Sequence, residues 1–245
     1  ISLQRDDLYL EYIALHNQTE QFEDAKVLLS TRNFHPWEGG EGKVVGQYLF
    51  THIELAKKAF TQKEFSQSLS LLDQAETYPI NLGEGKLLGT QENDIHYWKG
   101  LTHEALGNSE LALSYFQKAS SGISAPVQAI FYNDPQPDKI FYQGLAWQKL
   151  GEIQKAQEIF ERLIQFGEKH QNDAIKIDYF AVSLPDLLVF DVDLDERNHI
   201  HCQYLQGLGY LGLGKNQEAK QFFDAVLAKN INHQGALIHQ KMLIL

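Results

Sequence analysis

The chain has 245 residues, of which 43% are hydrophobic, with 18 glycines and six prolines. This composition is typical of a globular protein and excludes a disordered or collagen-like polymer. The formal net charge of −11 disfavours phosphate backbones and anionic lipid headgroups, so we expect neither nucleic acid nor membrane as a partner. Cys202 is the single cysteine; because it cannot form an internal disulfide, we expect a cytoplasmic location.

The chain shows no targeting or membrane-spanning pattern. It contains no run of 18 apolar residues, and its first residues, Ile1 to Asp7, lack the charged and apolar regions of a signal peptide. The only methionine is Met242. We therefore expect the chain to be a piece of a longer polypeptide.

Helical periodicity divides the chain into five pairs of helices and one terminal capping helix, expected to form a single repeat domain. In chain order, the pairs are expected at residues 6–36, 47–79, 93–122, 138–170 and 200–233, and the cap at 235–245.

The last three pairs share one pattern around the turn between their helices. Each turn contains Leu-Gly and a polar residue, and glycine supplies the left-handed conformation that ends a helix. Seven residues before this glycine stands another glycine, which would let the two helices cross closely; an alanine follows it after five residues and a phenylalanine after nine. The aligned residues are Gly100, Gly107, Ala112 and Phe116, then Gly144, Gly151, Ala156 and Phe160, then Gly207, Gly214, Ala219 and Phe223.

This pattern resembles the tetratricopeptide repeat, which implies an all-α superhelix of stacked helix pairs. The first two pairs match less well: Ala56 and Ser68 keep the small positions of the second, whereas Ile13 stands at the crossing position of the first. A terminal repeat is expected to depart from the pattern because one face lacks a neighbour. Insertions separate the repeats at about 79–92, 122–138 and 167–198, and loops of this kind often carry function.

Longer strings suggest a closer relationship. They are Asn33 to Lys43, Tyr78 to Gly83, Asn93 to Trp98, Tyr132 to Asp138, Ile177 to Asp191, Arg197-Asn198 and His201-Cys202. Together they resemble the C-terminal repeat region of large, mostly bacterial proteins whose N-terminal domain is uncharacterised and has a galactose-mutarotase-like β-sandwich. The resemblance implies a link to carbohydrate only through that other domain.

The string Gly-Glu-Gly-Lys occurs twice, ending at Lys43 and at Lys86. A phosphate-binding loop needs another glycine earlier and Ser or Thr after the lysine, and both are missing here. A tight turn that opens the next helix is the main interpretation. The alternative is a site for a sugar or a partner domain, in which an exposed Trp37 would stack on the ligand. The residues of that site would be His35, Trp37, Glu38, Glu41 and Lys43.

Metal and cofactor sites are not expected. The run from Asp191 to Glu196 resembles the start of a calcium loop, but it lacks glycine at position six and glutamate at position twelve, so a helix start is favoured. His199 and His201 are two residues apart and would not share a helix face. Cys202 has no nucleophile context, and a buried apolar role is favoured.

Two further sets of residues are candidates. Distinctive insertions hold Asn133, Asp134, Asp178, Tyr179 and Asp186, of which the carboxylates, with Glu38, could serve glycoside hydrolysis if they met in space. The first helices carry a ladder that either faces a partner groove or packs on the next repeat. The ladder consists of Leu10, Ile53, Tyr97, Phe141 and Tyr204.

The sequence therefore predicts a non-catalytic scaffold that binds protein, docking against its parent's own N-terminal domain. A separate protein partner is a second possibility. The alternative function is an accessory region that contributes residues to a carbohydrate site or processes glycans.

Overall fold

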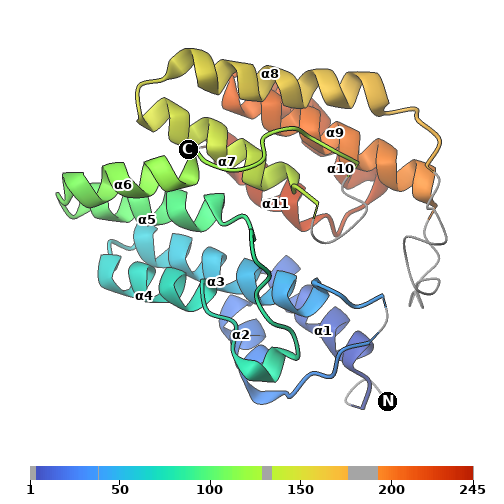
Figure 1. Cartoon of the computed structure of the whole chain (residues 1–245). Coiled ribbons are helices and arrows are strands. Elements are labelled where there is room, and N and C mark those ends of the chain that lie inside the picture. The colour runs from blue at the N-terminus through green and yellow to red at the C-terminus, as the bar shows by residue number, and fades with distance from the viewer. Residues whose placement is uncertain (1–3, 38, 129–133, 176–192, 245) are drawn as a thin grey trace. The chain divides into compact units, whose positions relative to one another are not determined.

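The computed structural model describes residues 4–37, 39–128, 134–175 and 193–244. Within these ranges the regular elements are helices, and none of the described residues lies in a strand (Figure 1). The prediction of an all-α chain built of helix pairs is confirmed. The paired helices are α1 Asp6–Gln18 with α2 Phe22–Thr31, α3 Lys43–Thr61 with α4 Phe65–Ala75, α5 Asn93–Ala105 with α6 Ser109–Ala119, α7 Pro137–Lys149 with α8 Ile153–His170, and α9 Leu194–Gly212 with α10 Asn216–Lys229.

The last helix is α11, Gln234–Lys241, followed by the 3₁₀ turn η3 at Met242–Ile244; a further 3₁₀ turn, η1, spans Ile80–Leu82. Helix α9 begins six residues before the expected start of its pair. Its start is fixed by Asp193, whose carboxylate accepts the N–H groups of Asp195 and Glu196 at 3.0 and 3.1 Å. This side-chain cap satisfies backbone donors that an uncapped helix leaves free.

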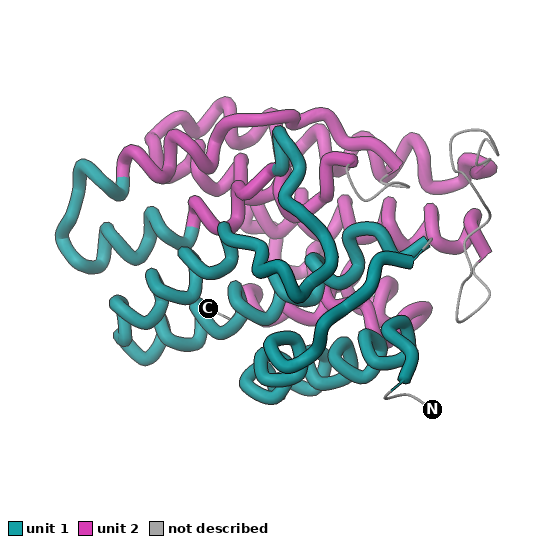
Figure 2. Tube along the Cα trace, turned by 60° about the horizontal axis from the view of Figure 1, so that its bottom comes forward, with its two compact units in different colours: residues 1–90, 98–112, 178–191 teal, residues 91–97, 113–177, 192–245 magenta. Residues whose placement is uncertain are grey.

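The described chain divides into two compact units (Figure 2). Unit 1 takes the described residues up to Thr90 together with Trp98–Ala112, and unit 2 takes Gln91–Tyr97 and the described residues from Leu113 onward. The two units therefore share α5 and α6, whose first and last residues belong to different units. The expectation of one continuous repeat domain stays a prediction.

The turns within the five pairs have one backbone geometry. Gly107, Gly151 and Gly214 have φ values of +78°, +78° and +71°, as predicted, and Glu20 and Lys63 hold the equivalent positions with φ values of 61° and 63°. In every turn the next N–H reaches back to a carbonyl five residues earlier, as in the hydrogen bonds from Asn108 to His103 at 2.9 Å and from Glu64 to Ala59 at 2.8 Å. This is the Schellman ending of a helix.

The predicted close crossings of the fourth and fifth pairs are confirmed. A Cβ added at Gly144 would lie 2.3 Å from the ring of Phe160, and one at Gly207 would lie 2.6 Å from the ring of Phe223. The aligned alanines are also in the core, with exposed fractions of 4% for Ala112 and 0% for both Ala156 and Ala219. Glycine at the crossing therefore allows a phenylalanine ring to fill the space between two helices.

Three asparagines close helix ends in a shared way that the sequence did not reveal. The side-chain amide of Asn81 donates to the carbonyls of Leu29 and Arg32, both at 2.8 Å, at the end of α2. Asn93 does the same for Ala119 and Ser121 at the end of α6, and Asn198 reaches His170 at the end of α8. Because the last carbonyls of a helix lack partners within it, these amides have a structural role.

Among the described residues, no helix is both long and apolar enough to cross a membrane.

Candidate functional site

Unit 1 contains a groove whose floor is one face of α3. The floor residues are Tyr48, His52, Leu55 and Ala59, spaced four, three and four apart, so they share a face of the helix. Helices α2 and α4 form its two walls. At 1.5 Å per residue, the floor from Tyr48 to Ala59 is about 16 Å long, which matches about five residues of an extended peptide.

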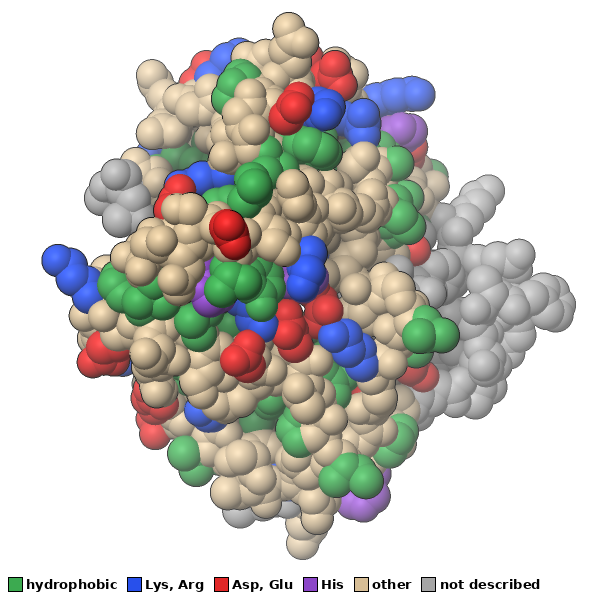
Figure 3. Space-filling view, turned by 60° about the vertical axis from the view of Figure 1, so that its left-hand side comes forward, with side chains coloured by type: hydrophobic (Ala, Val, Ile, Leu, Met, Phe, Trp, Pro, Cys, Tyr) green, Lys and Arg blue, Asp and Glu red, His purple; other side chains and the backbone are tan. Residues whose placement is uncertain are grey.

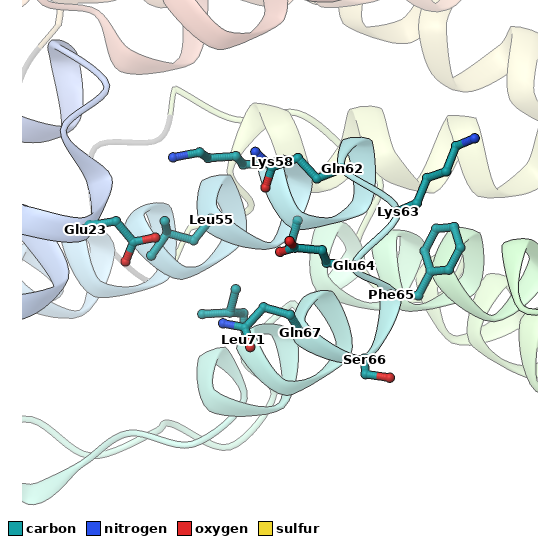
Figure 4. A pocket seen from close by; sticks show the side chains of 11 residues that line it. Glu23, Leu55, Lys58, Gln62, Lys63, Glu64, Phe65, Ser66, Gln67 and Leu71 are labelled. Atoms are coloured by element: carbon teal, nitrogen blue, oxygen red, sulfur yellow. The ribbon is translucent and has the colours of Figure 1, made fainter.

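The groove consists of two hollows that follow one another along α3. The hollow near the end of α3 has a volume of about 670 Å³. In Figure 4, Glu23 of α2 and Leu55 of α3 lie across from Glu64, and Gln67 and Leu71 of α4 lie below them. The side chains of Lys63, Phe65 and Ser66 extend away from this space (Figure 4).

The second hollow lies near the middle of α3 and has a volume of about 580 Å³. Its rim carries the exposed polar side chains of Ser30 from α2 and of Ser70, Gln74 and Thr77 from α4 and the residues after it. Its end is formed by Pro79, Asn81 and Leu82, where Asn81 also caps α2. Hydroxyl and amide groups above an apolar floor can bond the backbone of a bound peptide while the floor contacts its side chains.

The floor of this second hollow is held by hydrogen bonds. The hydroxyl of Tyr48 donates to the carbonyls of Gln74 and Thr77 at 2.9 and 3.2 Å, which ties α3 to the end of α4. The imidazole of His52 lies 2.8 Å, through Nδ1, from the carbonyl of Tyr48 and bonds Gln74 as well. Burial lowers the pKa of His52 to about 4. His52 is therefore neutral near pH 7 and acts as a polar part of a rigid floor.

The charges beside the groove are mixed. Lys26 and Lys58 line it, as do Glu23 and Glu64. Asp73 also lines it, but its carboxylate lies 2.6 Å from Nζ of Lys99, whose side chain is 2% exposed. Burial opposes the charge on Lys99, yet its bonds to Asp73 and Glu76 raise its pKa overall. The groove thus carries no single sign of charge that would select a strongly acidic or basic ligand.

The sequence-predicted site around the first Gly-Glu-Gly-Lys string is a structured turn. The carboxylate of Asp6 accepts the backbone N–H of His35 at 2.8 Å and lies 3.2 Å from its ring, while Glu41 and Lys43 are exposed. Trp37 is half-buried and packs against the hydrophobic core of unit 1. This corrects the expectation of an exposed stacking platform, because the tryptophan ring is partly covered. Glu38 lies outside the described residues.

Part of the cover comes from Gly40, where an added Cβ would lie 2.2 Å from the ring of Trp37. The two copies of the Gly-Glu-Gly-Lys string are joined, since the N–H of Gly42 donates to the carboxylate of Glu84 at 2.8 Å. The turn interpretation is confirmed for the first string, because α3 begins at Lys43 after Gly42 in the left-handed conformation. It is wrong for the second, because the helix after Lys86 begins only at Asn93.

The ladder residues are buried in the structure. Tyr97, Phe141 and Tyr204 are 9%, 1% and 6% exposed, and Leu10 and Ile53 are also buried. The ring centroid of Tyr97 lies 5.4 Å from that of Tyr142, and the centroid of Phe141 lies 5.9 Å from that of Phe160. These side chains are therefore covered in the structure, and a role toward a partner stays a prediction.

Most of the remaining candidates fall outside the described part of the chain. Asn133, Asp178, Tyr179 and Asp186 lie outside the described residues, and Asp134 is half-buried beside α7. Their meeting in a glycan-processing site stays a prediction.

The other motifs have structural explanations where they are described. Asp193 caps α9, while Nε2 of His201 lies 2.8 Å from the carbonyl of Val127. Burial raises the pKa of the Cys202 thiol to about 12, so this buried thiol is not a nucleophile. On the face drawn in Figure 3, hydrophobic side chains occur in several small groups separated by polar and charged ones.

Comparison with known proteins agrees with the repeats seen in the helices. Two tetratricopeptide repeat family models match the chain, one at residues 94–121 and the other at 140–165. These ranges fall on the third and fourth helix pairs. The chain thus contains tetratricopeptide repeats, and the fold prediction is confirmed at that level.

One solved structure that the comparison matches is that of YrrB, described as a TPR protein with an unusual peptide-binding site. The match covers 96% of this chain and 91% of the other, with 14% sequence identity and a TM-score of 0.30.

Proposed function

We propose that the chain is a non-catalytic protein-interaction module that binds an extended segment of a partner polypeptide in the groove of unit 1. The observation that carries this proposal is the groove itself, a preformed floor on α3, made of three largely apolar side chains and neutral His52, between two walls with exposed polar side chains. Tetratricopeptide repeats in the same chain support an interaction role. The groove is long, open and mixed in charge, which suits a peptide better than a small charged metabolite.

The partner that we favour is a segment of the N-terminal domain of the bacterial family that the sequence resembles. In that arrangement the repeats hold a neighbouring domain of the same polypeptide, and a cytoplasmic location would follow from the reduced Cys202. A contribution of the chain to a carbohydrate site would then be indirect, through the position of the other domain.

The experiment fills the groove and measures binding. Ser30→Trp on α2 and Ser70→Trp on α4 would each place an indole in the second hollow without removing a buried contact, because both serines are exposed. We expect either substitution to weaken binding of the separately expressed N-terminal domain at least tenfold in a calorimetric titration. Loss of one well-packed peptide side chain from a groove has an effect of this size.

Val27→Trp is the matched control. Val27 lies on the same helix as Ser30, is 58% exposed and lines neither hollow. Its replacement should leave the affinity within twofold of the wild type. If the domain does not bind at micromolar concentration, or binds all variants equally, the groove is not its site.

A further inference from the structure

The two hollows of the groove differ in the charges that line them. In the hollow near the end of α3, the carboxylates of Glu23 on α2 and Glu64 before α4 point toward each other on either side of Leu55 (Figure 4). Both glutamates are exposed, and neither forms an ion pair with another of the described residues. Two unpaired carboxylates that face one space attract a cation.

The lysines of this hollow offset only part of that charge. The side chain of Lys63 extends away from the space, and that of Lys58 runs on the opposite side of Leu55 from Gln67 (Figure 4). Within the described part of the chain, Lys58 forms no ion pair, so it does not neutralise either carboxylate by direct contact. A net negative charge therefore remains beside the side chain of Leu55, which is 3% exposed.

The hollow near the middle of α3 offers no unpaired carboxylate among the described residues that line it. Asp73 lines it, but its carboxylate lies 2.6 Å from Nζ of the buried Lys99. Lys26 on α2 lines it as well, and its positive charge adds to the lowering of the His52 pKa. The buried apolar side chains that line this hollow are Leu29, Tyr48 and Leu82. It therefore favours an apolar side chain and disfavours a basic one.

The distance between the hollows sets the spacing of two side chains that fill them together. Leu55 follows Tyr48 by seven residues on α3, and Ala59 follows His52 by seven, which at 1.5 Å per residue is about 10 Å. In the polyproline II conformation, side chains three residues apart lie on the same side of the chain and about 9 Å apart. A peptide in this conformation can therefore place one side chain in each hollow.

We propose that the partner segment carries a lysine or arginine and, three residues away, a large apolar residue, and that Glu23 and Glu64 select the basic one. The ammonium or guanidinium group lies between the two carboxylates, and the apolar side chain lies over His52. Polar groups on the walls bond the peptide backbone. This inference rests on the proposed function, because it assigns the chemistry of the segment that the groove binds.

The experiment selects peptides without assuming their sequence. Random twelve-residue peptides displayed on phage are captured by the whole chain and then tested on Ser30→Trp and Ser70→Trp, which fill the second hollow. Clones that bind the wild type and neither blocked variant are groove clones. We expect Lys or Arg to be enriched about threefold or more in these clones, with Leu, Ile, Met or Phe three positions before or after it.

A synthetic peptide of the most enriched sequence then measures the charge selection. Its basic residue is replaced by glutamine, and the wild type is compared with the double variant Glu23→Gln/Glu64→Gln. We expect the replacement to weaken binding to the wild type about fivefold, as the loss of two exposed ion pairs would, and to change binding to the double variant by less than about twofold. This cycle isolates the interaction from other effects of each change.

Asp24→Asn is the matched control. Asp24 follows Glu23 on α2, is exposed and lines neither hollow. Its replacement should leave the affinity of the unaltered peptide within about twofold of the wild type, and the glutamine peptide should still bind about fivefold more weakly. A thermal melt followed by circular dichroism checks that the double variant folds. If it does not, the two single variants give the same test, with an effect of about twofold each.

Failure of the charge selection and failure of the proposed function give different results. If no clone depends on the open groove, the proposed function is wrong and this inference falls with it. If groove clones lack a basic residue at that spacing from an apolar one, the groove binds peptides of other chemistry. If the glutamine replacement weakens binding equally in the wild type and the double variant, Glu23 and Glu64 do not select the basic residue.

Discussion

Two sets of three helices show how small residues decide between a groove and a closed core. In unit 2, α9 lies between α8 and α10, and a Cβ at Gly209 of α9 would lie 2.5 Å from the carbonyl oxygen of Phe160 on α8. In unit 1, α3 lies between α2 and α4. Ala56 of α3 and Gly207 of α9 hold the equivalent crossing positions. Two residues after them, α3 has Lys58 and α9 has Gly209. Lys58 lines the open groove.

Gly209 thus lets the backbones of α8 and α9 touch, whereas Lys58 at the equivalent position of α3 lines a hollow that Glu23 of α2 also lines. Gly212 extends the contact in unit 2, since its Cβ would lie 2.2 Å from the Phe160 ring. A repeat array can therefore leave a hollow at a position where longer side chains replace the glycines of a close contact, without a change in the helix order. Four changes to the chain would break or sharpen this comparison.

The largest loss of stability is expected from removing the ring of Phe160, around which α8 and α9 of unit 2 pack. Phe160 is completely buried, and the glycines that face it, Gly144 and Gly212, have no side chains to fill a gap. Phe160→Ala should therefore lower the free energy of unfolding by about 3–5 kcal/mol. Urea denaturation followed by circular dichroism measures this change. A loss below about 1 kcal/mol would contradict the central position of Phe160.

A smaller loss of stability is expected from adding a side chain where α9 touches the backbone of α8. Gly209→Ala would place a Cβ against the backbone carbonyl of Phe160, and a backbone atom cannot turn aside as a flexible side chain can. We expect a loss of about 1–3 kcal/mol. Gly46→Ala on α3 is the matched control, because its Cβ would meet nothing within 4 Å and alanine favours a helix. Its stability should be equal to or higher than that of the wild type in the same denaturation experiment.

The contribution of the groove floor in unit 1 to stability should depend on pH, because the floor contains His52. The pKa of His52 is lowered from 6.5 to about 4 in the folded protein by burial. Its contribution to stability is therefore complete above pH 6.5 and is lost as the pH falls from 6.5 toward 4. Between pH 7 and pH 5 the loss should be about 1–2 kcal/mol. His52→Gln should lack this part of the pH dependence in denaturation curves measured at both values.

The wild type and His52→Gln must be compared with each other because other histidines also respond to pH. His201 and His233 of unit 2 have lowered pKa values as well. Burial is the main cause for both, so they add their own acid sensitivity to the wild type and to His52→Gln alike. Only the difference between the two proteins reports on His52. Equal losses in both would show that His52 is not buried in its neutral form.

Much of the fold follows from local residue patterns. Gly107, Gly151 and Gly214 mark turns because few other residues adopt a positive φ at low cost, and the alanines of the second helices mark buried crossings. The acidic run from Asp191 to Glu196 predicted a helix start, which the Asp193 cap of α9 confirms. Which of its carboxylates caps the helix did not follow from the run, and the expected start of the pair at residue 200 was too late. The role of the asparagines was also hidden, since each caps a helix end that is distant in sequence.

The candidate groove could not be predicted in the same way. Its floor residues read as ordinary core positions of α3, and what makes them a floor is the separation of α2 from α4. No residue pattern marks such a gap locally. The ladder residues are buried, and part of the cover over Phe141 and Tyr204 comes from a distant segment, α11. Contacts of this kind depend on tertiary structure rather than on spacing along one helix.

The smallest effect is expected at the turns, where the first two pairs differ from the last three. Lys63 adopts a φ of 63°, which disfavours an L-residue by about 1–2 kcal/mol relative to the right-handed region. Glycine relieves this strain but costs about 0.5–1 kcal/mol more in chain entropy. Lys63→Gly should therefore stabilise the protein by about 0.5–1 kcal/mol, measured by the midpoint of urea denaturation.

Two further variants separate backbone strain from other effects of that substitution. Lys63→Ala removes the same charge but keeps a Cβ, so it should leave stability unchanged if strain is the cause. Gly151→Ala introduces the strain at the equivalent turn of unit 2, where a Cβ would meet nothing within 4 Å. It should destabilise the protein by about 1 kcal/mol. If Lys63→Ala stabilises as much as Lys63→Gly, the lysine charge, and not the left-handed backbone, limits the stability of this turn.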